Sequence, residues 1–147
     1  MDRGVAVVLT AVVGGFIALQ APINSQLGKT VGSWQAAAIS FTSGTVLLVA
    51  IVLVAGGGFG EVGEARRLPW YYLTGGVLGA AYVTTVLVTV RSLGAGGVVA
   101  ATIAGQLTMA VAVDQLGVLG LEKQSVTALK LLGVALLAAG TFLVIRE

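Results

Sequence analysis

The sequence contains no cysteine and no histidine. Without these side chains the chain cannot form a disulfide, a thiolate nucleophile or an imidazole general base, and it lacks the usual ligands of structural zinc. It also has no Ser–His–Asp set, no paired intramembrane carboxylates and no phosphate-binding glycine motif. We therefore expect no enzyme activity, no metal site and no cofactor.

Charge is the second scarcity. Only 10% of the 147 residues are charged, whereas 57% are hydrophobic. A soluble domain typically has about 25% charged residues to cover its surface. The net charge of +2 is too small and too scattered for a nucleic-acid partner. The lipid bilayer is the expected environment of this chain.

The few charges leave long uncharged runs between them. A helix needs about 20 apolar residues to cross the hydrocarbon core. Four runs reach that length, and the last does so if Lys130 extends its ammonium group toward the headgroups. The uncharged runs are residues 4–28, 30–60, 68–90, 92–113 and 131–145. The fold class is therefore all-α, an integral bundle of five transmembrane helices in one domain, 1–147, multi-pass in the bacterial inner membrane.

The same runs give approximate helix bounds. Ser33 is a candidate N-cap, Pro69 a candidate first helical residue, and Gly94, Gly96 and Gly97 a candidate turn. An alternative interpretation of the N-terminal run is a cleavable signal peptide, but the run is longer than a typical signal core. The predicted helices are 5–27, 34–54, 70–90, 98–119 and 126–145.

Five helices place the two termini on opposite sides of the membrane. The first side holds four or five Lys and Arg residues and the other side three, and such a small imbalance specifies orientation weakly. Either the chain inserts with its N-terminus in the cytoplasm, or it inserts both ways and forms an antiparallel dimer with inverted symmetry. The first side carries Arg3, Arg66, Arg67 and Lys123, with Lys130 if it points outward; the second carries Lys29, Arg91 and Arg146.

Gly133 and Gly140 are seven residues apart and share one face of the last helix. Small residues let membrane helices approach closely. The face either packs within the bundle or forms an interface with a second copy of the chain.

Polar residues gather in the second half of the first helix. Gln20 and Asn24 share a face, and Pro22 should kink or break the helix by removing a backbone donor. Broken helices commonly build transporter sites, although this stretch could simply leave the membrane before Lys29. Ser40, Tyr82 and Gln106 give the next three helices polar groups that could complete a substrate-binding crevice.

Asp114 is the only acid within a predicted span. A carboxylate inside an apolar segment costs about 2.5–3.5 kcal/mol on insertion scales, so it should face a cavity or a partner. Burial favours its neutral form and could make it a reversible proton carrier. The alternative is that the helix ends at Val113 and Asp114 meets water, with Glu122 as a substitute in the following loop.

Two segments carry a resemblance to a known family. GGFIALQAPINSQLGKTVGSWQAAAISFTSGTVLL (14–48) and GQLTMAVAVDQLG (105–117) resemble the YdcZ-type family of the drug/metabolite transporter superfamily, and LKLLGVALLAAGTFLV (129–144) is similar to the last helix of many superfamily members. The resemblance implies a five-helix half-transporter. Such a protein works as an antiparallel homodimer, as a heterodimer of opposite paralogues, or as half of a fused ten-helix protein. The balanced charges favour the homodimer. Small multidrug resistance relatives have a Glu in the first helix, which this chain lacks.

Three functions remain open. The first is a proton-coupled secondary transporter of an unidentified small or amphipathic metabolite, with Asp114 as the proton carrier. The second is a passive channel, and the third is a membrane scaffold or accessory subunit that transports nothing.

Overall fold

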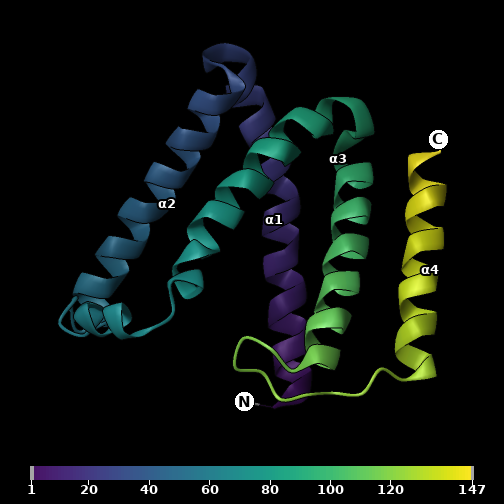
Figure 1. Cartoon of the computed structure of the whole chain (residues 1–147). Coiled ribbons are helices and arrows are strands. Elements are labelled where there is room, and N and C mark those ends of the chain that lie inside the picture. The colour runs from purple at the N-terminus through teal and green to yellow at the C-terminus, as the bar shows by residue number, and fades with distance from the viewer. Residues whose placement is uncertain (1, 147) are drawn as a thin grey trace. The chain divides into compact units, whose positions relative to one another are not determined.

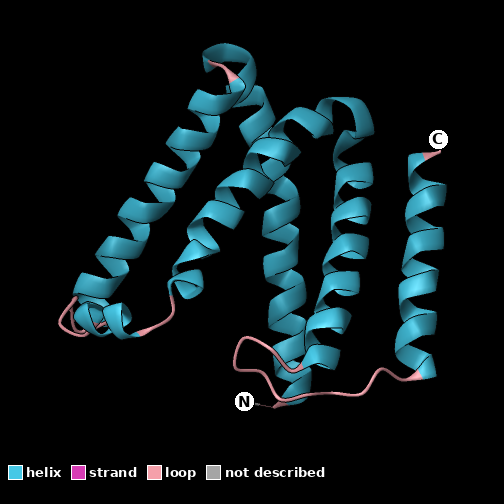
Figure 2. Cartoon of the chain, viewed as in Figure 1, coloured by secondary structure: helices cyan, strands magenta, loops and turns pink. Residues whose placement is uncertain are grey.

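A computed structural model describes residues 2–146, and these residues form helices and connecting loops (Figure 2). Met1 and Glu147, the ends of the predicted 1–147 domain, lie outside the described residues. The all-α fold class is confirmed. The elements are α1 (Arg3–Val31), α2 (Ser33–Ala55), the 3-10 helices η1 (Val62–Arg67) and η2 (Trp70–Thr74), α3 (Gly75–Leu116) and α4 (Ala128–Ile145), labelled in part in Figure 1.

Four of these helices are long and apolar enough to cross a membrane, where the sequence analysis expected five. The difference comes from α3, which joins the third and fourth predicted helices. Gly94 interrupts it with φ 68° and ψ 169°, a backbone conformation that no α-helix contains. Each arm of α3 on either side of Gly94 is long enough for one crossing of about 20 residues.

The turn predicted at residues 94–97 is shorter in the structure than expected. Only Gly94 leaves the helical conformation, while Gly96 and Gly97 lie in the second arm of α3. A positive φ is easily reached by glycine because it has no Cβ. One residue is therefore enough to end the first arm and start the second.

Several predicted helix ends also differ. Ser33 is not the N-cap residue of α2, because the helix begins at Ser33 and Gly32 occupies the N-cap position. No side chain caps that end of the helix. Pro69 precedes the short helix η2 instead of opening a long helix. The helix expected to end at residue 119 ends at Leu116, and Gly117 follows it with φ 62°. A glycine with positive φ directly after a helix is a common terminator.

Pro22 does not break α1. The helix continues through it from Arg3 to Val31, and the Asp2 carboxylate caps its start by accepting from the backbone N–H groups of Gly4 and Val5. Proline has no N–H group, so the carbonyl of Ala18 loses its usual helical donor. The predicted interruption of the first helix is therefore reduced to one missing hydrogen bond.

The chain divides into two compact units, Met1–Arg91 and Ser92–Glu147. In the first unit α1 and α2 form an antiparallel pair, and the first arm of α3 packs against them (Figure 1). The core of this unit consists of Ala36, Ala37, Val83 and Leu87. In three of the four spans, at most 6% of the residues in the most apolar stretch of 18 residues are buried. Such low burial is expected for helices that face lipid.

The second unit is an antiparallel pair formed by the second arm of α3 and α4. Near one end, the Thr141 hydroxyl donates to the backbone oxygen of Ala100 at 2.9 Å. At the other end, Lys130 Nζ lies 3.6 Å from Asp114 Oδ2. These contacts fix the register of the two helices.

Candidate functional site

A small polar centre lies where the three helices of the first unit meet. Asn24 of α1 is 7% exposed, and its side-chain amide donates to the Ser40 hydroxyl of α2 at 3.2 Å. Gln20 and Asn24 line a void of about 10 Å³ together with Tyr82 of α3. That volume is about the size of one water molecule, so the centre is closed to a larger solute.

Four of the predicted substrate-binding residues thus occur together in the first unit: Gln20, Asn24, Ser40 and Tyr82. Gln106 lies exposed on the second arm of α3, in the second unit. A crevice that combines all five residues remains a prediction.

Asp114 lies in the last turn of α3, which continues to Leu116 instead of ending at Val113. Its side chain is 33% exposed and faces the ammonium group of Lys130 at the start of α4. The connecting loop folds back onto this end, because Gln124 donates its backbone N–H to the Asp114 carbonyl at 2.8 Å and accepts from Lys130 Nζ at 3.3 Å. Asp114 therefore combines partial burial with a cationic partner.

The glycine pair of α4 has no close neighbour in its own unit. A Cβ built on Gly133 or on Gly140 would meet no atom within 4 Å, although both residues are half-buried. By contrast, Gly97 of α3 lies against Leu93 and Ile145. Packing inside the second unit thus accounts for Gly97 and leaves the α4 pair unexplained.

The sequence analysis missed an apolar groove between α2 and the first arm of α3, with a volume of about 630 Å³. Trp34, Ala37, Ala38 and Phe41 supply its α2 wall, and alanines at 80 and 81 supply much of its α3 wall. The α2 residues recur at intervals of three, four and seven, which places them on one helix face. Small residues between two aromatic ones on that face were the available signal.

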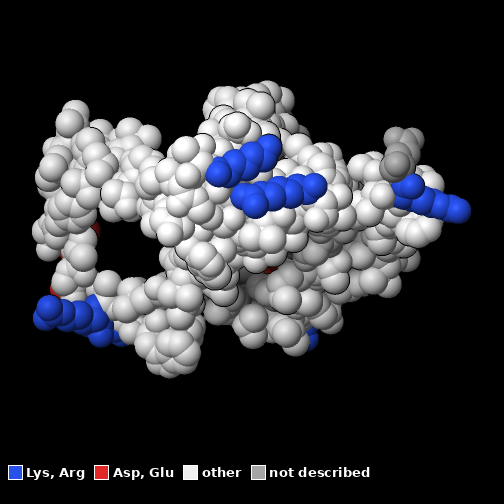
Figure 3. All heavy atoms as spheres, turned by 90° about the horizontal axis from the view of Figure 1, so that it is seen from above, with Lys and Arg blue, Asp and Glu red and all other residues white. Residues whose placement is uncertain are grey.

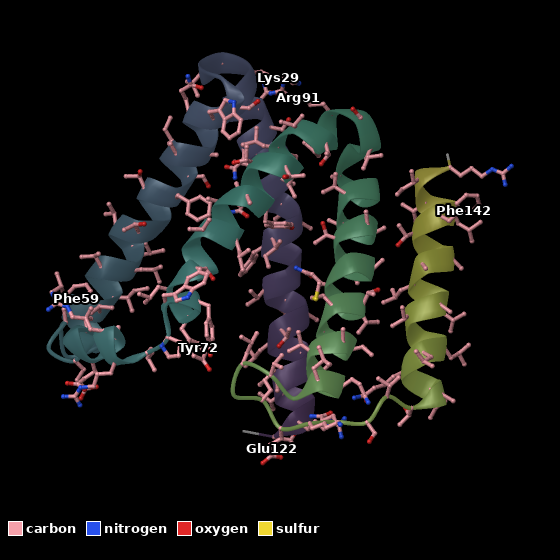
Figure 4. The ribbon with its side chains drawn as sticks, in the orientation of Figure 1. Lys29, Phe59, Tyr72, Arg91, Glu122 and Phe142 are labelled. Atoms are coloured by element: carbon pink, nitrogen blue, oxygen red, sulfur yellow. The ribbon has the colours of Figure 1, made fainter. Side chains whose placement is uncertain are left out.

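Two cations lie at the end of the first unit where α1 turns into α2. Figure 4 places Lys29 and Arg91 at this end, and two basic side chains lie side by side on the face seen in Figure 3. Arg91 Nη2 donates to the Ser33 hydroxyl at 3.3 Å. Neither cation forms an ion pair within residues 2–146.

Within residues 2–146, no group of three or more Asp and Glu side chains lies together. The groove offers an apolar surface with room for a ligand, whereas the polar centre is too small for one. An apolar surface of this kind suits the noncovalent binding of a solute.

Comparison with known proteins identifies the family. A family model described as "Putative inner membrane exporter, YdcZ" matches residues 5–143. No curated protein and no solved structure matched the chain. The match covers every helix described above, apart from the first residues of α1 and the last residues of α4. The apolar helices agree with a multi-pass inner-membrane protein. The chain belongs to the YdcZ family and is a multi-pass protein of the inner membrane.

Proposed function

We propose that this chain is a secondary exporter that works as a dimer of two oppositely oriented copies and is driven by protons. The family match over residues 5–143 is the observation that carries the export function. In this proposal the two arms of α3 cross the membrane separately, which gives five crossings and an inverted partner. An inverted pair would supply the twofold symmetry that many secondary transporters have within one chain.

The dimer proposal is supported by two features. Lys and Arg are nearly balanced between the two predicted sides, so the chain has little preference for one orientation. Gly133 and Gly140 share one face of α4, and a Cβ built on either would meet no atom within 4 Å. In this proposal α4 packs through that face against α4 of the inverted copy.

The proposed proton carrier is Asp114. In the ionised state it pairs with Lys130 at 3.6 Å, and protonation would remove the charge that holds the pair together. Lys130 belongs to α4 and Asp114 to α3, so breaking the pair would loosen one end of the second unit. A proton could thus alter the contact between two membrane helices, which is the kind of coupling that an exporter requires.

Export can be tested without knowing the substrate. Cells expressing the wild-type chain are compared with cells expressing Asp114→Asn by mass spectrometry of the medium. We expect at least one metabolite to accumulate outside wild-type cells, to fall on addition of a protonophore, and to fall to background with Asp114→Asn. Glu122→Gln is the matched control, because Glu122 is an exposed acid in the adjacent loop.

The possible results separate the hypotheses. Accumulation that survives both the protonophore and Asp114→Asn would exclude proton coupling through Asp114. Loss of this accumulation with Glu122→Gln but not with Asp114→Asn would assign the proton coupling to Glu122. A medium that is unchanged by the wild-type chain would favour a scaffold.

A further inference from the structure

The groove between α2 and α3 is lined almost entirely by carbon. The two threonines in its wall, Thr84 and Thr85, turn their hydroxyl groups back to the carbonyls of Ala80 and Ala81 at 2.8 and 2.9 Å. Their donors are therefore already used within the helix. A ligand in this groove would meet methyl groups and two aromatic rings, so its buried part must be aliphatic.

The groove leads toward the two cations. On α3, Arg91 follows Thr84 by seven residues, which places both on one helix face about two turns apart. On α2, the groove residue Trp34 follows Ser33, whose hydroxyl accepts from Arg91. Arg91 Nη2 also lies 3.3 Å from the position that a Cβ would take on Gly28, next to Lys29. One end of the apolar groove is thus positively charged.

No acid of the first unit compensates this charge at that end. Asp2 caps the opposite end of α1, while Glu61 and Glu64 lie in the connection that follows α2. The uncapped start of α2 adds a partial positive charge of the same sign. A cationic amphiphile would be repelled here, whereas a carboxylate could form charge-assisted hydrogen bonds with the guanidinium group.

We propose that the groove binds an anionic amphiphile with a single aliphatic chain, such as a fatty acid, whose carboxylate is held by Lys29 and Arg91. One chain is specified because one stripe of alanines lies between the two aromatic residues Trp34 and Phe41. The volume of about 630 Å³ lies within the usual range of ligand sites. That this ligand is the exported substrate rests on the proposed function, but its binding does not.

Trp34 provides a direct probe, because it lines the groove and is one of only two tryptophans. The full chain carrying Trp70→Phe is placed in nanodiscs of zwitterionic lipid at about pH 9, where fatty acids are ionised and lysine is still charged. Dibromostearate, whose bromines quench nearby tryptophan, is titrated against Trp34 fluorescence. The reference probe is a dibrominated alkyltrimethylammonium with the same chain length.

We expect saturable quenching by dibromostearate and only weak, nonsaturable quenching by the cationic probe. Lys29→Gln and Arg91→Gln should each weaken dibromostearate binding about three- to fivefold, as expected for a partly exposed ionic contact. Ala81→Leu should weaken the saturable component, because the larger side chain would project into the groove. The matched controls are Arg66→Gln for charge and Ala11→Leu for volume, both exposed and outside the groove.

Equal quenching by the two probes would overturn the proposal, because it would show contact with any lipid chain. Quenching by brominated phosphatidylglycerol but not by dibromostearate would also overturn it and assign the groove to bilayer lipid. Binding of dibromostearate without any exported metabolite would leave the site standing and remove the export function. Export of a metabolite without dibromostearate binding would support the export function and remove the proposed site.

Discussion

Among the glycines inside the helices of residues 2–146, Gly28 would bring a Cβ closest to a side chain of another helix, and adding one methyl group there should destabilise the first unit. A Cβ on Gly28 would lie 2.7 Å from Leu87 Cδ2, well inside the ordinary contact range of 3.4–4 Å. Leu87 has no exposed surface and belongs to the core of the unit, so its side chain has little room to move. Overpacking of this kind costs about 1–3 kcal/mol. The clash is steric, so the figure does not depend on the hydrophobic effect.

The measurement is the free energy of unfolding of Gly28→Ala in mixed micelles, by titration with a denaturing detergent and circular dichroism. Gly14→Ala is the matched control on the same helix, since nothing lies within 4 Å of a Cβ there. The control should be neutral or slightly stabilising, because alanine favours helix over glycine. We expect the two variants to differ by at least about 1 kcal/mol.

A double-mutant cycle locates the cause. Leu87→Ala removes the atom that the new methyl group would meet, so Gly28→Ala should cost much less in that background. If Gly28→Ala is as stable as Gly14→Ala, or if Leu87→Ala leaves its cost unchanged, the contact between α1 and α3 is not as described.

Two further predictions concern α3. Thr141→Val removes the hydrogen bond from α4 to α3 and should lower the free energy of unfolding by about 0.6 kcal/mol, a typical value for membrane helices. Thr108→Val is the control, because the Thr108 hydroxyl donates within its own helix, and it should lower the free energy of unfolding by less. Equal losses for the two variants in the same unfolding titration would contradict this. Gly94→Ala forces a side chain into a backbone with φ 68° and ψ 169° and should destabilise the fold by about 1–3 kcal/mol, while Gly105→Ala, in a helical position with nothing within 4 Å, should not. A stable Gly94→Ala variant in the same titration would mean that the interruption of α3 is not needed.

The membrane class and the approximate positions of the long apolar helices could be predicted from charge alone. An uncharged run must be helical in lipid because its backbone groups have no other partners. The end of the fourth predicted helix could also have been found, since Gly117 is a recognisable terminator after Leu116. The interruption of α3 was harder to place. Gly94, Gly96 and Gly97 can all adopt a positive φ, and the sequence does not say which one does.

The polar face of α1 could be predicted from the sequence, but the contacts of that face with other helices could not. Asn24 was assigned to a polar face because of its spacing from Gln20, and such spacing depends only on the local helix. Its hydrogen bond to Ser40 depends on how α1 meets α2, which follows from the turn at Gly32. The groove was missed for the same reason. Alanines such as Ala38 carry no chemical signal until a second helix supplies the opposite wall.

The glycines inside the helices differ in whether another helix lies close to them, and this difference bears on how two copies of the chain could assemble. Helices in lipid gain little from hydrophobic burial, so small residues matter mainly where they let backbones or side chains come close. The glycines Gly28, Gly79, Gly96 and Gly97 meet this condition, because a Cβ on each would have a neighbour within 4 Å from outside its own turn. Gly133 and Gly140 have none, yet a glycine inside a helix is less favourable than alanine by about 1 kcal/mol in water. Their place on one face of α4 is accounted for if another helix packs there, and an inverted second copy would bring its own α4 to that position.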